Sequence, residues 1–270
     1  MSDQQEFRRL LLTGGAGGLG TVLRHRLKPF TRVLRVSDRV DLGAAKPGEE
    51  LVACELADKA AVHRLVEGVD GVVHFGGISL ESPFEPILQS NIVGVFNLYE
   101  AVRKHGVKRV VFASSNHVTG FYRQSEKIGV DAPMRPDGLY GVSKCFGENL
   151  SRLYFDRYGI ETVCLRIGSS FPLVKDRRML ATFLSYDDLV ELVRCALFAP
   201  VVGHTVIFGA SDNSLKWWDN TKAAHLGFMP RDASDTQRER VEATSPLLDP
   251  ADPAGIFQGG AFVRAGPYDD

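Results

Sequence analysis

Residues 9–20 read RLLLTGGAGGLG, an apolar run followed by glycines at positions 14, 17 and 20. The run predicts a buried strand, and the glycines after it predict a tight turn into a helix. Glycines at this spacing let the backbone approach a pyrophosphate closely, and the positive end of the next helix attracts its charge. A flexible turn is the alternative interpretation, but the flanking strand and helix favour a dinucleotide site formed by Gly14, Gly17, Leu19 and Gly20.

The remaining sequence alternates short apolar runs rich in β-branched residues with longer segments of helical periodicity. We expect strands at residues 9–13, 32–37, 50–54, 71–75, 109–113 and 161–167. We expect helices at residues 18–28, 59–67, 84–105, 139–158 and 186–198, and a last amphipathic segment at 214–226. Strands that are apolar throughout are buried on both faces, so the pattern predicts an α/β fold, a doubly wound parallel sheet of the Rossmann type.

The length and charge of the chain limit both its domain number and its partners. Its 270 residues fit one α/β domain, in which residues 1–168 mainly bind the dinucleotide and residues 169–270 form a small C-terminal substrate-binding part and a tail. With 32 Lys+Arg against 33 Asp+Glu, the net charge of −1 gives no field that attracts nucleic acid or an anionic membrane. No apolar run is long enough for a signal segment or a membrane span, so we expect a cytoplasmic protein.

The cysteines and histidines give no indication of disulfides or of a metal site. The four cysteines show no C-x-x-C spacing and two lie in predicted strands, so we expect four reduced thiols. No pair of histidines has ligand spacing together with a third partner, and we therefore predict no metal. His74 is expected to belong to the strand core.

Asp38 ends the second predicted strand, eighteen positions after the last glycine of the turn. A carboxylate at this place accepts hydrogen bonds from both hydroxyls of an adenosine ribose and repels a 2′-phosphate. The residue therefore predicts NAD rather than NADP as the cofactor. Two features leave this preference open: Asp38 could be an ordinary turn residue, and the adjacent Arg39 could pair with a phosphate.

Tyr140 and Lys144 lie four residues apart at the start of a predicted helix, so both side chains share one face. Ser114 and Ser115 follow the fifth predicted strand, at the sheet edge where ligands bind, although serines there can also simply form a turn. Bringing the pKa of a tyrosine to near neutrality takes about 3–4 kcal/mol of phenolate stabilisation, and one close ammonium supplies about that much. We predict Tyr140 as general base, Lys144 as its electrostatic partner and a ligand of the nicotinamide ribose, and Ser115 as the group that holds the substrate oxygen.

Several motifs together resemble the extended short-chain dehydrogenase/reductase family over residues 9–208. They are Gly14-x-x-Gly17-x-x-Gly20, Val72-Val73-His74-Phe75-Gly76-Gly77, Asn91-x-x-Gly94, Ser114-Ser115 and Tyr140-x-x-x-Lys144. Within the family, residues 114–120 (SSNHVTG) and 166–172 (RIGSSFP) are most similar to members that oxidise free uronic acids. The resemblance implies an NAD-dependent enzyme that oxidises C1 of cyclic glucuronate or galacturonate to the aldaric acid lactone.

The same resemblance implies further site residues. Besides the glycine turn, Tyr140 and Lys144, the cofactor would contact Asp38, Glu55, Leu56, Phe75, Gly76, Gly77 and Asn91. The uronate would contact Ser79, Ser115, Asn116, His117, Ser169 and Arg178. Glu55 stands where the family more often has an aspartate. His117 is either a hydrogen-bonding imidazole in the sugar pocket or a partly buried residue at the start of a helix.

Arg178 also has a physical reason to bind a sugar carboxylate, because a guanidinium presents a two-pronged set of donors. It follows the sixth predicted strand as half of the pair Arg177-Arg178. Such pairs are commonly solvated surface, which is the alternative interpretation.

Two other functions remain open from the sequence. A sugar-nucleotide epimerase or dehydratase would share the cofactor motif, Tyr140 and Lys144, but resembles longer chains and usually has an asparagine where Ser169 stands. A non-catalytic NAD-binding sensor would have no need for a tyrosine beside a lysine.

The C-terminal tail contains one apolar stretch, GIFQGGAFV at residues 255–263. Such a stretch requires a docking surface, either on its own domain or on a neighbouring subunit. The family resemblance suggests a homo-oligomer whose subunits associate through helices, one of which is the helix with Tyr140.

Overall fold

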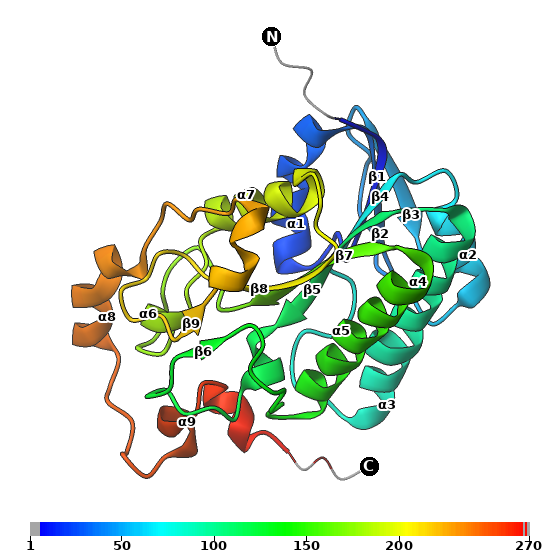
Figure 1. Cartoon of the computed structure of the whole chain (residues 1–270). Coiled ribbons are helices and arrows are strands. Elements are labelled where there is room, and N and C mark those ends of the chain that lie inside the picture. The colour runs from blue at the N-terminus through cyan, green and yellow to red at the C-terminus, as the bar shows by residue number, and fades with distance from the viewer. Residues whose placement is uncertain (1–5, 267, 269–270) are drawn as a thin grey trace.

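A parallel sheet of seven strands forms the centre of the computed structural model, which describes residues 6–266 and 268 (Figure 1). From one edge to the other the strands are β3 (Glu49–Ala53), β2 (Thr31–Asp38), β1 (Phe7–Thr13), β4 (Gly71–His74), β5 (Arg109–Ser115), β7 (Glu161–Ile167) and β8 (His204–Gly209). Each strand pairs in parallel with its neighbours. The strand order changes direction at β1 and β4, so the predicted doubly wound Rossmann fold is confirmed.

Strand β8 is an addition to the six predicted strands, all of which are present. It pairs with β7 at the edge of the sheet. Two of its six residues, His204 and Val206, remain partly exposed, so the segment lacks the fully buried character of the central strands. An edge strand with a polar start gives a weaker sequence signal than a strand covered on both faces.

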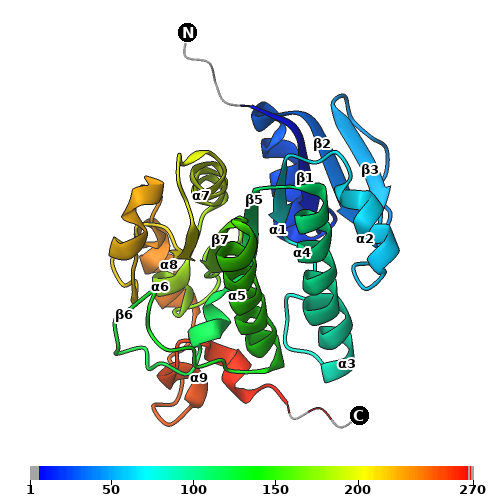
Figure 2. The ribbon, with the colours of Figure 1, turned by 45° about the vertical axis from the view of Figure 1, so that its right-hand side comes forward.

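Helices cover both faces of the sheet (Figure 2). One face carries α2 (Lys59–Val66), α4 (Gly94–His105) and α5 (Leu139–Tyr158), and the other carries α1 (Gly18–Arg26) and α7 (Tyr186–Phe198). Successive residues of β1 divide between the two cores: Leu10 and Leu12 belong to the core under α1 and α7, and Leu11 to the core under α2 and α4. This alternation explains why every residue of the strand centre has to be apolar.

The predicted helix at residues 84–105 is interrupted. It consists of α3 (Phe84–Ile87), a π-helical turn (Leu88–Val93) and α4, and it ends at Gly106, whose φ of 73° closes the last turn. Turns of this kind are frequent at functional sites, and this one contains Asn91.

A smaller region packs beyond the carboxyl ends of the strands. It contains the strand pair β6 (Ile128–Gly129) and β9 (Trp218–Asp219), and the helices α6 (Met179–Thr182), α8 (Arg238–Thr244) and α9 (Pro253–Ile256). Short 3-10 turns lie at Lys28–Phe30, Asn116–Thr119, Thr221–Leu226, Ser234–Gln237 and Gly260–Arg264. The segment 214–226, predicted as one amphipathic element, consists of β9 and a 3-10 turn. Trp218 in β9 stacks on Phe208, with 5.0 Å between the ring centroids.

The apolar tail docks on its own chain, which decides between the two predicted docking surfaces. The buried Gln258 side chain donates to the carbonyls of Arg123 (3.1 Å) and Glu126 (2.9 Å) and accepts from Trp218 Nε1 (2.9 Å). The Gly259 N–H donates to the carbonyl of Gly120 at 2.8 Å. Figure 1 shows this segment, in red, close to β6.

None of the helices in the described part of the chain is long and apolar enough to cross a lipid bilayer.

Candidate active site

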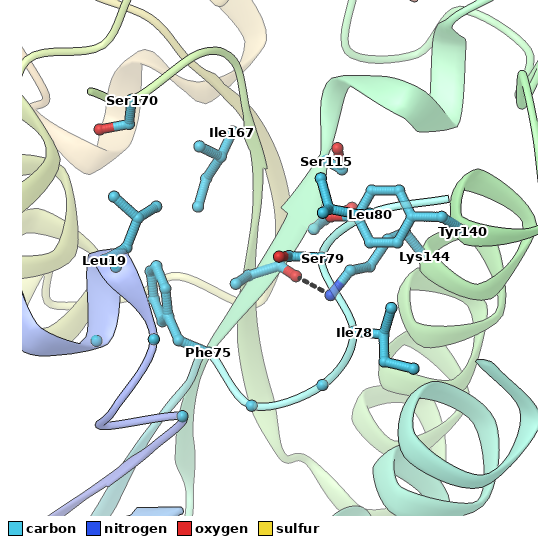
Figure 3. Close-up of a pocket in the computed structure, with 18 of the residues that line it drawn as sticks. Leu19, Phe75, Ile78, Ser79, Leu80, Ser115, Tyr140, Lys144, Ile167 and Ser170 are labelled. Carbon is cyan, nitrogen blue, oxygen red and sulfur yellow. Dashed lines mark hydrogen bonds between the residues drawn. The ribbon is translucent and has the colours of Figure 1, made fainter. Parts of the chain in front are cut away.

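A cavity of about 850 Å³ extends along the carboxyl ends of the strands, where the switch point of the sheet lies. The predicted site residues in its wall are Gly14, Gly17, Leu19, Gly20, Asp38, Glu55, Leu56, Phe75, Gly76, Gly77, Ser79, Ser115, Asn116, His117, Tyr140, Lys144, Ser169 and Arg178. Asn91 is absent from this wall. Figure 3 shows Leu19 and Phe75 on one side of the cavity, with Ser115, Tyr140 and Lys144 on the other.

The glycine-rich turn leaves no room for a side chain at Gly14 or Gly20. A Cβ on Gly20 would lie 1.8 Å from the carbonyl oxygen of Gly14, and one on Gly14, whose φ is 76°, would lie 2.5 Å from the Phe75 carbonyl. The first turn of α1 carries no acidic side chain, so the positive end of the helix is not neutralised locally. These features fit the pyrophosphate of a dinucleotide.

Asp38 lies at the end of β2 and faces the same turn. Its Oδ2 accepts from the Ala16 N–H at 3.0 Å, and its Oδ1 accepts from the N–H of Arg39 at 2.8 Å. Oδ1 also accepts from the Val40 N–H at 3.3 Å, whereas Oδ2 accepts a single hydrogen bond and retains capacity for a ribose hydroxyl. The residue thus links the second strand to the phosphate-binding turn, as an NAD site requires.

Tyr140 and Lys144 are both buried, with 6% and 7% of their surfaces exposed. Lys144 Nζ donates to the carbonyl of Ala113 at 2.8 Å and lies 5.6 Å from the centre of the Tyr140 ring. Burial raises the pKa of Tyr140 to about 12, the Asp137 carboxylate adds to this rise, and a hydrogen bond with Ser115 opposes it. Burial also lowers the pKa of Lys144 to about 8.

The prediction stays that Lys144 lowers the pKa of the tyrosine and that the positive charge of an oxidised nicotinamide adds to this effect; burial opposes both. One ammonium at about 4–6 Å from a phenolate contributes about 3–4 kcal/mol in an effective dielectric near 20. Ionising a tyrosine of pKa about 12 near neutral pH takes about 7 kcal/mol. Burial therefore opposes the effect of the lysine, and the positive charge of an oxidised nicotinamide would act together with Lys144.

The two serines at the end of β5 have different partners, because successive strand residues point to opposite sides. Ser114 Oγ donates to Glu148 Oε1 at 2.6 Å, and Glu148 also forms a buried ion pair with Arg166. Ser115 instead lies beside Tyr140 in the cavity (Figure 3). Both serines line the cavity, but the Ser114 hydroxyl is engaged by Glu148, so Ser115 is the better placed of the two for a substrate oxygen.

Asn91 supports the cavity wall from outside it, and its contact with the cofactor stays a prediction. Its Nδ2 donates to the carbonyl of Ile78 (2.9 Å) and to Ser143 Oγ (3.0 Å), and its Oδ1 accepts from the Ile78 N–H (2.8 Å). These bonds use both N–H groups of the amide and tie the loop after β4 to helix α5. That loop contains Ser79.

Arg178 is half-buried in the cavity wall, which overturns the alternative of a solvated surface arginine. Its Nε donates to the Gln258 carbonyl (2.7 Å) and its Nη1 to Ser169 Oγ (3.3 Å). With the Asn116 amide oriented to donate to the carbonyl of Ile167, its oxygen accepts from Arg178 Nη2 at 2.8 Å. No carboxylate of residues 6–266 or 268 forms an ion pair with this guanidinium, whose pKa is lowered by burial.

The neighbouring Arg177 points elsewhere. Its Nε donates to the carbonyl of Ser245 at 2.9 Å, and its Nη2 donates to that of Glu242. The Arg177-Arg178 pair is therefore divided between a structural role and the cavity.

The two central histidines have separate environments. His74 lies in the core, hydrogen-bonded to Thr13 Oγ1 at 2.7 Å, and burial lowers its pKa to about 3, so its predicted core position is confirmed. His117 lies in the cavity wall, with Nδ1 2.7 Å from Asp137 Oδ2 and its ring stacked on Phe262.

Several wall residues were not found from the sequence. Gly259, Ala261 and Phe262 reach the cavity from the C-terminal tail, whose apolar stretch was the only signal. The four cysteines are free, and in the described part of the chain no three His, Cys, Asp or Glu side chains group together as a metal site requires.

Comparisons with known proteins show which family the chain resembles along most of its length. Residues 10–185 match the NAD dependent epimerase/dehydratase family. The uronate dehydrogenase of Pseudomonas putida is 62% identical over 264 residues, which cover 97% of this chain and 98% of that protein. A mutant uronate dehydrogenase from Agrobacterium tumefaciens, solved in complex with NAD, has a TM-score of 0.95 at 52% identity, covering 97% of this chain and 99% of that one. The glucuronic acid dehydrogenase of Chromohalobacter salexigens has a TM-score of 0.95 at 53% identity, covering 96% and 98%.

Proposed function

The chain belongs to the NAD dependent epimerase/dehydratase family, and we propose that it oxidises free uronic acids, glucuronate or galacturonate, at C1 to the aldaric acid lactone, with NAD as its cofactor. The observation that carries this proposal is the half-buried Arg178 guanidinium, which no carboxylate of the described residues pairs with. A guanidinium held in this way is suited to the carboxylate of a sugar acid. The activity of relatives that are 54% to 62% identical supports the same substrate class.

Oxidation at C1 removes a proton from the anomeric hydroxyl and a hydride from C1, so the cyclic hemiacetal becomes a lactone. Ser115 holds the C1 oxygen through its hydroxyl, and Tyr140 accepts the proton. Arg178 binds the carboxylate at the far end of the sugar, aided by Ser169 and Asn116. Ser79 and His117 contact the remaining hydroxyls.

The cofactor is held by the chain's own backbone and by a few side chains. The glycine turn and the start of α1 bind the pyrophosphate, Asp38 binds the ribose of the adenosine, and Lys144 binds the ribose of the nicotinamide. Glu55 and Leu56 border the adenine. When bound, NAD supplies the hydride acceptor and, in its oxidised form, a positive charge that favours the phenolate of Tyr140.

Two further proposals concern organisation. Residues 1–168 mainly bind the dinucleotide, and residues 169–270 mainly complete the substrate side through Ser169, Arg178 and the tail. The chain also forms a homo-oligomer through α4 and α5, because Phe96 and Val142 on these helices are 42% and 50% exposed. Light scattering should then give a multiple of 29.7 kDa, and a monomer mass would exclude this assembly.

The test of the activity is the absorbance of NADH with purified protein and matched sugars. We expect turnover of glucuronate and galacturonate with NAD, little turnover of glucose or galactose, and none of UDP-glucuronate. Equal rates with the uronates and with the neutral sugars would contradict the proposal that Arg178 binds the sugar carboxylate. Action on UDP-glucuronate alone would indicate a sugar-nucleotide enzyme, and binding of NAD without any turnover would indicate a sensor.

A further inference from the structure

Asp137 is a buried carboxylate that the proposed chemistry does not use. Its side chain is fully buried, just before helix α5, and its Oδ2 lies 2.7 Å from His117 Nδ1. Its Oδ1 is buried too and accepts no hydrogen bond from residues 6–266 or 268. A buried carboxylate with so few hydrogen-bond partners is unfavourable for folding. Because its one side-chain partner among the described residues is His117, we infer that Asp137 is kept at this place for its effect on His117.

The backbone around Asp137 leaves room for this carboxylate and for little else. A Cβ on Gly120 or on Gly259 would lie 1.9 Å from Asp137 Oδ2, and one on Gly141 would lie 3.2 Å from Oδ1. The three glycines come from the turn after β5, the C-terminal tail and helix α5. Three separate segments therefore meet around one side chain.

The hydrogen bond fixes which nitrogen of His117 carries the proton. A carboxylate only accepts, so Nδ1 donates to it, and in a neutral ring Nε2 is then an acceptor. Burial lowers the pKa of His117, against the raising effect of Asp137, which keeps the ring neutral near pH 7. Nε2 has no hydrogen-bond partner within the described residues, and the ring lies in the cavity wall.

Phe262 fixes the plane of the same ring. Its ring centroid lies 3.7 Å from that of His117, with 22° between the planes. The His117 ring is thus held at one nitrogen by Asp137 and on one face by the C-terminal tail. The free nitrogen has a defined direction as well as a defined protonation state.

We propose that Asp137 is a positioning residue, which fixes the Nδ1–H tautomer of His117 so that Nε2 accepts a hydrogen bond from a hydroxyl of the substrate. The role of Nε2 toward a sugar rests on the proposed function, but the tautomer does not. Asp137 therefore contributes to the selection of a polyhydroxylated substrate without touching it.

The tautomer is measured directly by nitrogen NMR of protein labelled with ¹⁵N-histidine. The His117 signals are identified by their loss in His117→Gln. In the unchanged protein at pH 7 we expect a protonated Nδ1 and an unprotonated Nε2. In Asp137→Asn the amide can donate to Nδ1, and the proton moves to Nε2, as amide substitution does in other carboxylate–imidazole pairs. An unprotonated Nδ1 in the unchanged protein would overturn the proposal, and this result does not depend on how Asp137→Asn folds.

Steady-state kinetics test the consequence for the substrate. Asp137→Asn keeps the size of the side chain, and we expect the KM for glucuronate to rise about tenfold while kcat changes less than about threefold and the Kd of NAD is unchanged. Asp131→Asn is the matched control, because it makes the same chemical change in an exposed ion pair with Lys222. It should leave all three constants unchanged.

The outcomes separate this proposal from the proposed function. If the unchanged protein does not oxidise uronates, the proposed function fails while the NMR result still decides the tautomer. If it does oxidise them and Asp137→Asn has the KM of the unchanged protein, the positioning role is wrong.

Discussion

Glu81 caps the helix that carries Tyr140. Its Oε2 accepts a hydrogen bond from the Tyr140 N–H at 2.9 Å, and its Oε1 accepts one from the Leu139 N–H at 2.7 Å. Helix α5 begins after Gly138, which offers no side-chain cap of its own. A carboxylate from the loop after β4 supplies both the missing acceptor and a negative charge at the positive end of the helix. The same loop carries Ser79, so the cap joins two parts of the predicted site.

Replacing Glu81 with alanine should therefore affect stability and catalysis together. We expect a loss of about 1–2 kcal/mol in the free energy of unfolding, because two helix N–H groups lose their acceptor. We also expect a lower kcat, since Tyr140 lies in the uncapped turn. Urea unfolding and NADH kinetics measure the two effects. Glu85→Ala is the control, because Glu85 is exposed and bonds only to Gln89; equal losses in both variants would argue against a capping role.

Tyr140→Phe should bind NAD with unchanged Kd and lose at least about 10³-fold in kcat, since it removes only the hydroxyl that accepts the proton. Fluorescence titration and NADH absorbance provide the two measurements. Tyr158→Phe, at the other end of the same helix and 38% exposed, should keep full activity. If Tyr140→Phe turns over at nearly the rate of the unchanged protein, Tyr140 is not the general base.

Lys144 should make the protein less stable at neutral pH than an uncharged side chain would. Its pKa is lowered to about 8 in the folded state, so between about pH 8 and its ordinary pKa the unfolded chain binds more protons. Stability then rises with pH through this range, and the penalty of the buried ammonium is fully present below about pH 8. We expect Lys144→Met to be more stable by about 2–3 kcal/mol at pH 7.

This difference should shrink as the pH approaches 10, because the folded protein then holds a neutral lysine. Urea unfolding at pH 7, 8, 9 and 9.5 measures the trend. Lys108→Met, at an exposed lysine whose Nζ donates to the carbonyl of Tyr158, should show no comparable trend. A constant difference between Lys144→Met and the unchanged protein would mean that Lys144 does not titrate in this range.

Arg178→Lys should raise the KM for glucuronate about 10- to 100-fold with a smaller change in kcat, because an ammonium keeps the charge but loses the two-pronged geometry. Arg177→Lys is the neighbouring control, since Arg177 bonds to Ser245 and Glu242 outside the cavity. NADH kinetics over a range of glucuronate concentrations test both variants. An unchanged KM in Arg178→Lys would place the sugar carboxylate elsewhere.

Local patterns were enough to predict most of the fold and, in the cavity wall, the glycine turn, Asp38, Ser115, Tyr140 and Lys144, whereas most of the other predicted wall residues followed from the family resemblance. The glycine spacing, the apolar strands and the i, i+4 pair Tyr140 and Lys144 each depend on a few consecutive residues, whose faces follow from the helix and strand periods. The edge strand β8 and the two short elements at 214–226 were missed because their patterns are weak and their packing decides them.

The amino-acid sequence by itself determined the order of strands and helices, the turn that receives a dinucleotide, and the shared face of Tyr140 and Lys144. Only the tertiary structure decided which distant groups meet: Asp137 with His117 across 20 residues, Glu81 with Tyr140 across 59, and the Gln258 carbonyl with Arg178 across 80. It also decided that burial raises the pKa of Tyr140. Periodicity specifies the faces of single elements, whereas contacts and desolvation depend on how all elements pack together.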